Sequence, residues 1–272
     1  TKAFTTINDP VTGTQTQAVE VRTGANIDLK EEEGENFNIG VVWEAVEDLT
    51  LKVDYYHIEI EDLVTDLAPQ FIVDECGPDQ DGTLCPLVHR DPQGGLLGGY
   101  IESNAQNLSY QAVSGVDFTV EYDWDLGDYG DVGFNLLWAY VDSLETRLFD
   151  DSSTVENIGL ATLPENRVGF VTDWNRQAWG ATIRVDWIDE MCGLYSVDCA
   201  SEDWIDDYTL VSGTIRYDAD DYGRIMLGVQ NIFDEDPADD PTDNDWPWFF
   251  ENGGYSNPLG RTWTLTYTYD FK

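Results

Sequence analysis

The chain carries a strict alternation of apolar and polar positions that recurs in segment after segment. In a helix the two sets would spread around the circumference, whereas in a strand successive side chains point to opposite faces. The final segment therefore predicts a two-faced β-strand, with threonines and Asp270 on its polar face. Its apolar positions are Trp263, Leu265, Tyr267, Tyr269 and Phe271.

The same pattern upstream predicts about nine strands in all, each of roughly 9 to 14 residues. Strands of this length are long for a soluble sandwich but suit a tilted crossing of an outer membrane. We therefore predict an all-β fold, an antiparallel transmembrane β-barrel. The alternating segments are 37–43, 49–55, 116–124, 132–140, 168–174, 179–187, 211–217, 225–229 and 263–271.

The connections between these strands alternate between short and long. Short turns are expected at residues 47–48, 126–131, 175–176 and 218–222, and long loops at 63–98, 148–164, 189–206 and 236–258. Outer-membrane barrels have short turns on the periplasmic side and long loops on the outer side. Residues 1–35 alternate only weakly, and we expect an outer loop there that leads into the first strand, with the barrel occupying residues 36–272.

The composition adds an extreme charge. The chain has 54 Asp plus Glu against 13 Lys plus Arg, a formal net charge of −41. Such a charge argues against nucleic acid as a partner and fits a cationic ligand, bound divalent ions or a salty habitat. A solvated acidic surface suited to high ionic strength is the favoured interpretation.

No apolar stretch reaches the length of about 18 residues that a transmembrane helix needs. The chain begins at Thr1 with neither an initiating Met nor a signal peptide, which is expected of a mature amino terminus or of a truncation.

Four cysteines form two close pairs, Cys76 with Cys85 and Cys192 with Cys199, each in a polar segment rich in turn residues. Close pairs in such segments predict two local disulfides, made in an oxidising compartment such as the periplasm. A zinc site is the weaker alternative, because the pairs lack CxxC spacing and only His57 and His89 could add ligands.

No catalytic constellation is recognisable, so we expect neither an enzyme nor a cofactor or metal site. Asp79, Asp81 and Gly82 look like a fragment of a calcium loop but lack the later ligands, and an ordinary turn is favoured. The long loop at 236–258 combines acidic residues with aromatic side chains. These aromatic rings could either stack on a ligand or fold back to stabilise the loop. These candidate ligand-binding residues are Trp246, Trp248, Phe249 and Phe250.

Several motifs, in order, resemble those of TonB-dependent receptors. The most specific is Asn231-Ile232-Phe233-Asp234-Glu235-Asp236-Pro237, followed after a long loop by Gly260-Arg261 and an alternating strand that ends in Phe271. Others are Ile27-Asp28-Leu29-Lys30-Glu31 before Glu35-Asn36-Phe37, then Val53-Asp54-Tyr55-Tyr56, Ser114-Gly115-Val116-Asp117 and Leu163-Pro164-Glu165-Asn166-Arg167. The resemblance covers most of residues 25–271.

This resemblance implies a receptor of the Gram-negative outer membrane that takes up a scarce nutrient (a siderophore, haem, cobalamin or glycan) with energy relayed by TonB. The whole barrel would have about 22 strands around an amino-terminal plug. About nine strands cannot close such a barrel, and neither a plug nor a TonB box is present, so we expect a carboxy-terminal fragment.

The implied partners are membrane lipid, lipopolysaccharide, the TonB complex acting through the missing plug, a small nutrient ligand and the barrel-assembly machinery. That machinery would read the alternating final strand, although Lys272 follows the terminal aromatic Phe271. Two alternatives stay open: a small self-contained porin or adhesin, and a secreted β-sandwich that binds a ligand.

Overall fold

The computed structural model describes residues 1–149, 152–193, 199–242 and 259–271, and the chain divides into two compact units. Unit 1 consists of Thr1–Gly34, Ile60–Gln111 and Arg147–Ser153. Unit 2 consists of Glu35–Glu59, Ala112–Thr146 and Thr154–Lys272.

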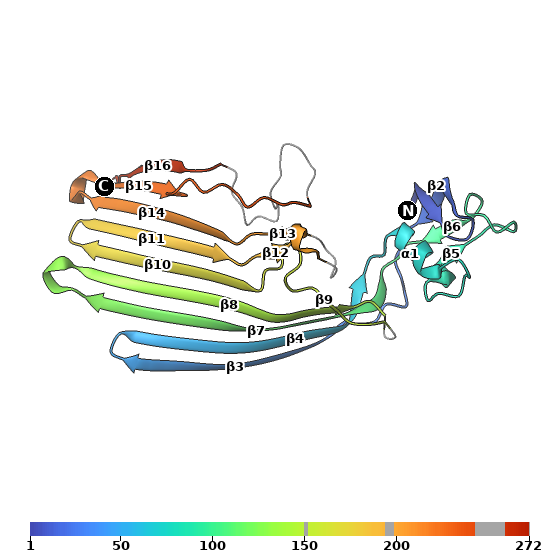
Figure 1. Ribbon diagram of the computed structural model, residues 1–272, viewed down its shortest axis with the longest axis horizontal. Helices are drawn as coiled ribbons and strands as arrows, with labels where there is room; N and C mark the ends of the chain where they lie inside the picture. The colour runs from blue at the N-terminus through green and yellow to red at the C-terminus, as the bar shows by residue number, and fades with distance from the viewer. Residues whose placement is uncertain (150–151, 194–198, 243–258, 272) are drawn as a thin grey trace. The chain divides into compact units, whose positions relative to one another are not determined.

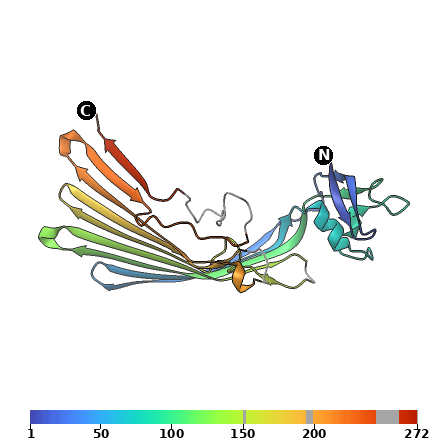
Figure 2. The ribbon, with the colours of Figure 1, turned by 45° about the horizontal axis from the view of Figure 1, so that its top comes forward.

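Unit 2 is built on one antiparallel sheet whose strands follow one another as a curved wall in Figures 1 and 2. Within the described residues its path contains nine strands, and the short β9 (Val155–Glu156) pairs with β8 beside it. The predicted all-β antiparallel fold is confirmed. In spatial order the nine are β16 (Thr262–Thr268), β15 (Arg224–Gln230), β14 (Tyr208–Asp218), β11 (Trp179–Ile188), β10 (Asn166–Arg176), β8 (Asp131–Arg147), β7 (Gln106–Asp125), β4 (Leu49–Thr65) and β3 (Glu33–Val46).

The strand register keeps the two faces of this sheet distinct, because directly opposed residues point to the same face. One row across six strands is apolar: Val132, Trp174, Ala181, Ile215, Leu227 and Leu265. The next row, on the opposite face, is small or polar: Gly133, Asp173, Thr182, Thr214, Gly228 and Thr264.

The apolar face is solvent-exposed instead of buried. Exposed fractions reach 74% for Leu265 and 64% for Trp263 on β16, and 63% for Val41 on β3. A β-sandwich would bury this face against a second sheet. The described residues of unit 2 contain no such covering sheet, which leaves an apolar surface suited to lipid.

Two of the short turns share one construction. The helical turns η2 (Gly127–Tyr129) and η4 (Asp220–Tyr222) are each followed by a glycine with positive φ, 94° at Gly130 and 90° at Gly223. In each turn an aromatic side chain of a later strand donates a hydrogen bond to the tyrosine carbonyl. Trp174 Nε1 lies 2.8 Å from the Tyr129 oxygen, and the Tyr267 hydroxyl lies 2.7 Å from the Tyr222 oxygen.

The turn expected at residues 175–176 lies two positions later. Asn175 pairs with Gly180 and Arg176 with Trp179, so the strand continues and the chain turns at Gln177, whose φ is 51°. The other three short turns form at the predicted places.

Among the long connections, residues 189–207 contain a small two-stranded sheet, β12 (Met191–Cys192) with β13 (Trp204–Ile205), and η3 (Ser201–Asp203). The disulfide between Cys192 and Cys199 lies in this connection. Its Cα atoms are 6.1 Å apart.

Unit 1 combines residues 1–34 with the long connection between β4 and β7. Its sheet has the order β1 (Lys2–Asp9), β2 (Thr14–Arg22), β6 (Tyr100–Glu102) and β5 (Val88–His89), and it packs with α1 (Pro69–Cys76) and η1 (Cys85–Leu87). Its core is Ile7, Val19, Leu67, Ile72, Val73, Leu84, Leu96 and Ile101. The alternation at residues 1–22 is too weak to predict β1 and β2, because one inward position of β1 is the acidic Asp9.

Among the described residues, no helix has both the length and the apolar character needed to cross a membrane.

Candidate ligand-binding site

Unit 1 contains a cavity of about 540 Å³ at the point where three strands end. The last residues of β4 contribute Glu61 and Asp62, and the first residues of β7 contribute the stretch from Asn107 to Tyr110. Arg147 is the final residue of β8. Cavities of a few hundred cubic ångströms lined by a few convergent polar groups are typical of small-ligand sites.

Asn107 fixes the backbone on one side of the cavity. Its side-chain oxygen accepts a hydrogen bond from the Lys30 amide at 2.8 Å, and its side-chain nitrogen donates to the carbonyls of Lys30, at 3.2 Å, and Asp62, at 2.7 Å. One asparagine on β7 thereby holds the segment before β3 next to the end of β4. Lys30 is placed at the cavity by these three bonds and not by its own charge.

The same segment is fastened at two further points. The Gly24 amide donates to the Asn104 side chain at 2.7 Å, and Asn26 donates from its side chain to the Ala105 carbonyl at 3.0 Å. Residues 24–30 therefore lie along the start of β7 through side-chain-to-backbone bonds, which is how a connection without regular secondary structure satisfies its polar groups.

Arg147 lies on the aromatic ring of Tyr110. The guanidinium carbon is 4.8 Å from the ring centroid, a distance at which a cation is attracted to the face of the ring. The Nε atom of Arg147 is buried and has no hydrogen-bond partner among the described residues. The stacked guanidinium is thus oriented but not saturated with acceptors.

The remaining wall of the cavity is apolar and is continuous with the core of unit 1. Leu108 and Phe149 line it and also pack against the buried core of unit 1. Beside them, the Ser109 hydroxyl donates to the Leu63 carbonyl at 3.2 Å. A ligand here would contact rings and aliphatic groups on one side and charged groups on the other.

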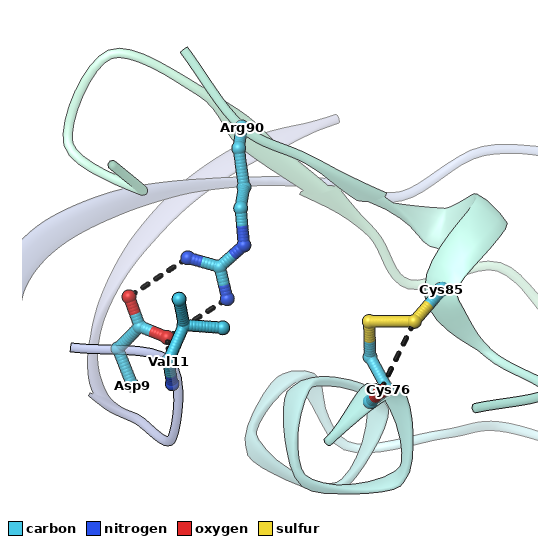
Figure 3. Close-up of a disulfide and its surroundings, with 5 residues drawn as sticks. All are labelled: Asp9, Val11, Cys76, Cys85 and Arg90. Carbon is cyan, nitrogen blue, oxygen red and sulfur yellow. Dashed lines mark hydrogen bonds and ion pairs between the residues drawn. A yellow bond between two sulfur atoms is a disulfide. The ribbon is translucent and has the colours of Figure 1, made fainter. Parts of the chain in front are cut away.

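Two covalent or ionic links hold the rest of unit 1 together, and Figure 3 shows both. The Cys76–Cys85 disulfide joins the end of α1 to the start of η1. Arg90 donates two hydrogen bonds of 2.8 Å to the carboxylate of Asp9, which is 2% exposed. Hydrogen bonding from Arg90 lowers the pKa of Asp9 despite its burial, so the pair is ionised at neutral pH.

The cations of unit 1 divide into two groups. Lys2 and Arg22 pair with Glu20, and Arg90 pairs with Asp9. Lys30 and Arg147 form no ion pair with any described residue, and both line the cavity. In so acidic a chain, cations without a carboxylate partner are unexpected.

The residues selected from the sequence have different outcomes. Both predicted disulfides are present. The aromatic candidates Trp246, Trp248, Phe249 and Phe250 lie outside the described residues, so their ligand-binding role stays a prediction. Trp263, Leu265 and Tyr267 belong to β16, while Tyr269 and Phe271 follow its end, and their role in barrel assembly stays a prediction as well.

The described residues contain no group of three or more His, Cys, Asp or Glu side chains arranged to hold a metal ion. The cavity could not be predicted from the sequence, because Lys30, Asn107 and Arg147 are far apart in the chain. The alternating segment predicted at 132–140 ends before Arg147, which the structure places at the end of β8.

Residues 1–232 match the family described as "TonB dependent receptor-like, beta-barrel". A search of curated proteins gave no match.

Solved structures with a similar fold include the ferric enterobactin receptor of Pseudomonas aeruginosa, at 17% identity and a TM-score of 0.59 over 92% of this chain. The FrpB iron transporter of Neisseria meningitidis is also similar, at 12% identity and a TM-score of 0.56 over 89%. In both cases this chain covers 32% of the length of the solved chain, so it spans about a third of these proteins.

Proposed function

The chain belongs to the TonB-dependent receptor family, and on that premise we propose that it is the carboxy-terminal part of an outer-membrane receptor that takes up a scarce nutrient. The nutrient would be a siderophore, haem, cobalamin or a glycan. The proposed location is the outer membrane of a Gram-negative bacterium. The proposed role is binding and transport without catalysis.

The observation that carries this proposal is the two-faced sheet of unit 2. Its exposed apolar rows suit the hydrocarbon core of a bilayer, and its opposite rows are polar enough to line an aqueous pathway. On the polar face, Lys52 pairs with Glu121 at 2.9 Å and Arg184 pairs with Asp186 at 2.5 Å. Ion pairs of this kind belong in a water-filled lumen and not against lipid.

Within the described part of the chain the sheet ends at β3 on one side and β16 on the other, and neither edge strand has a partner on its outer side. In hydrocarbon each unpaired group costs several kcal/mol, so a barrel must close. We propose that further strands of a longer chain complete the barrel and that a plug inside it contacts TonB. The long loops would then face outward, and the short turns would face the periplasm.

The proposed partners follow from this arrangement. Membrane lipid and lipopolysaccharide would contact the apolar rows, and a small nutrient would enter from the side of the long loops. The barrel-assembly machinery would recognise β16 and the aromatic residues after it, with Tyr269 and Phe271 already in edge-to-face contact at 5.1 Å.

The direct test is growth of a host strain that depends on this protein. Cells would be limited in turn for iron, haem, cobalamin or glycan, with and without a functional TonB, and membranes would be fractionated in parallel. We expect the protein in the outer membrane and growth on one nutrient class only when TonB is present. Growth that does not depend on TonB, or a protein found in the soluble fraction, would overturn the proposal.

A further inference from the structure

We infer that the unit 1 cavity binds a small organic anion through Lys30 and Arg147, and that this anion is the charged part of the nutrient. The second half of this inference rests on the proposed function, whereas the anion site itself does not. The ligand class it names is a carboxylate or similar oxyanion attached to a ring or other apolar group.

The first argument is the distribution of cations. The three other cations of unit 1 are used in ion pairs, two on an exposed strand face and one in the buried Asp9–Arg90 pair. The two that have no carboxylate partner among the described residues converge on one cavity. Each comes from a different part of the chain, so their convergence is a property of the fold.

The second argument is preorganisation. Asn107 holds the Lys30 backbone with two hydrogen bonds, and the Tyr110 ring holds the Arg147 guanidinium in place. A guanidinium fixed on a ring loses little further freedom when an oxyanion binds to it, and its planar fork matches a carboxylate. Preorganisation of this kind raises affinity by lowering the entropic cost of binding.

Two carboxylates also line the cavity, and they restrict where an anionic group can bind. Glu61 and Asp62 are both exposed, so water and salt screen their charges, whereas Arg147 is half-buried and screened less. Asp62 contacts Asn107 through its main-chain carbonyl. The anionic group is therefore expected against the Arg147 guanidinium, with the exposed Lys30 side chain adding a second positive charge.

The third argument is the apolar part of the cavity lining. Arg147 lies over the Tyr110 ring, and Phe149 and Leu108 line the same cavity. Rings at this position would contact an apolar group bonded to the anionic group. A hydrated inorganic ion would make no favourable contact with this apolar surface.

The test compares two probes of the same shape that differ in charge, benzoate and benzamide. Binding is measured by isothermal titration calorimetry on the complete protein in an uncharged detergent at low salt. We expect saturable binding of benzoate, with benzamide binding at least about tenfold more weakly, because hydrogen bonds to charged groups are the stronger kind.

Three variants identify the site. Arg147→Gln and Lys30→Gln should each weaken benzoate binding by at least about tenfold. Arg176→Gln is the matched control, because Arg176 also lies over a tyrosine ring, 5.9 Å from the Tyr129 centroid, but belongs to unit 2; it should bind benzoate as the unmodified protein does. Lys30 is exposed, so its substitution tests the site even if the Arg147 variant disturbs folding.

Equal binding of benzoate and benzamide, absence of benzoate binding, or full binding in the Lys30 variant would each overturn the anion site. Calorimetry in detergent does not require energised uptake. A failure here therefore leaves the proposed function standing, and growth without TonB dependence would leave the anion site standing.

Discussion

Arg90 and Asp9 form a two-pronged ion pair in the interior of unit 1. The two terminal nitrogens of the guanidinium each lie 2.8 Å from a different oxygen of the carboxylate, and the two side chains are 8% and 1% exposed. The pair joins the end of β1 to the residue after β5. It therefore ties the amino-terminal hairpin to the long connection between β4 and β7.

Replacing Asp9 by Asn should destabilise unit 1 by about 3–5 kcal/mol, because the Arg90 charge would stay buried without its partner. Hydrogen exchange of the β1 and β2 amides measures this loss locally. The control is Glu20→Gln in the exposed network with Lys2 and Arg22, which should cost less than about 1 kcal/mol. Equal protection of β1 in the two variants would contradict the structural role of the pair.

The same ion pair should make the stability of unit 1 depend on pH. Arg90 lowers the pKa of Asp9 in the folded chain below its unfolded value, which is about 3.9. The stability it contributes is therefore fully present above about pH 4 and is lost as the pH falls through the lowered folded pKa. Protection of β1 amides, corrected for intrinsic exchange at each pH, should fall in this acidic range. The Asp9→Asn variant should lack this component, and an identical profile in both proteins would refute it.

Removing the Cys76–Cys85 disulfide with a double Cys→Ala substitution should destabilise unit 1 by about 2–3 kcal/mol, because the unfolded chain would regain the freedom of a short closed loop. Exchange of α1 amides is the measurement. Substituting Cys192 and Cys199 in the same way is the control, since that bond lies in unit 2 and should leave α1 protection unchanged. Equal effects of the two double variants on α1 would contradict this assignment.

The sheet of unit 2 could be predicted from the sequence because its signal is local. Alternation with a period of two is visible within a single segment such as 262–271, and the turns are marked by Asp and Gly residues at Asp128, Gly130, Asp221 and Gly223. The sequence predicts the turn two positions before its actual place at residues 177–178. Asn175 and Arg176 look like turn residues, but both still pair with β11.

Unit 1 could not be predicted, because its core is assembled from residues that no local pattern connects. Ile7, Val19, Ile72 and Ile101 come from three distant segments, and each is 1% exposed or less. Its helix α1 spans only Pro69–Cys76, too short to show a helical period inside a polar connection. The cavity depends on the same long-range packing, so neither Lys30 nor Arg147 could be selected beforehand.

Two glycines should be irreplaceable at the short turns. A Cβ at Gly223 would lie 2.3 Å from the Thr268 carbonyl oxygen, and one at Gly130 would lie 2.1 Å from the Asn175 carbonyl oxygen, while both residues have positive φ. Gly223→Ala or Gly130→Ala should therefore cost the conformational penalty of about 1–2 kcal/mol plus roughly 1–3 kcal/mol of steric strain, measured by urea unfolding followed by tryptophan fluorescence.

Gly127 provides the control for these turns. It also has a positive φ, 61°, but a Cβ there would meet nothing within 4 Å. Gly127→Ala should cost only the conformational penalty of about 1–2 kcal/mol or less. If it proved as damaging as Gly223→Ala, the close approach of the neighbouring strand would not be the cause.

The exposed apolar row of unit 2 gives the sharpest test of its membrane role. Leu265 is 74% exposed and pairs with Leu227 in the apolar row, whereas its neighbour Thr264 pairs with Gly228 on the polar face. In a bilayer, Leu265→Arg should destabilise the barrel by about 2–4 kcal/mol, because an arginine would face hydrocarbon near the midplane. Thr264→Arg places the same charge one position away on the polar face, and its cost should be much smaller. Urea unfolding of the complete protein in lipid vesicles, with heat-dependent gel mobility as the assay of assembly, measures both, and equal costs would mean that the apolar face does not contact lipid.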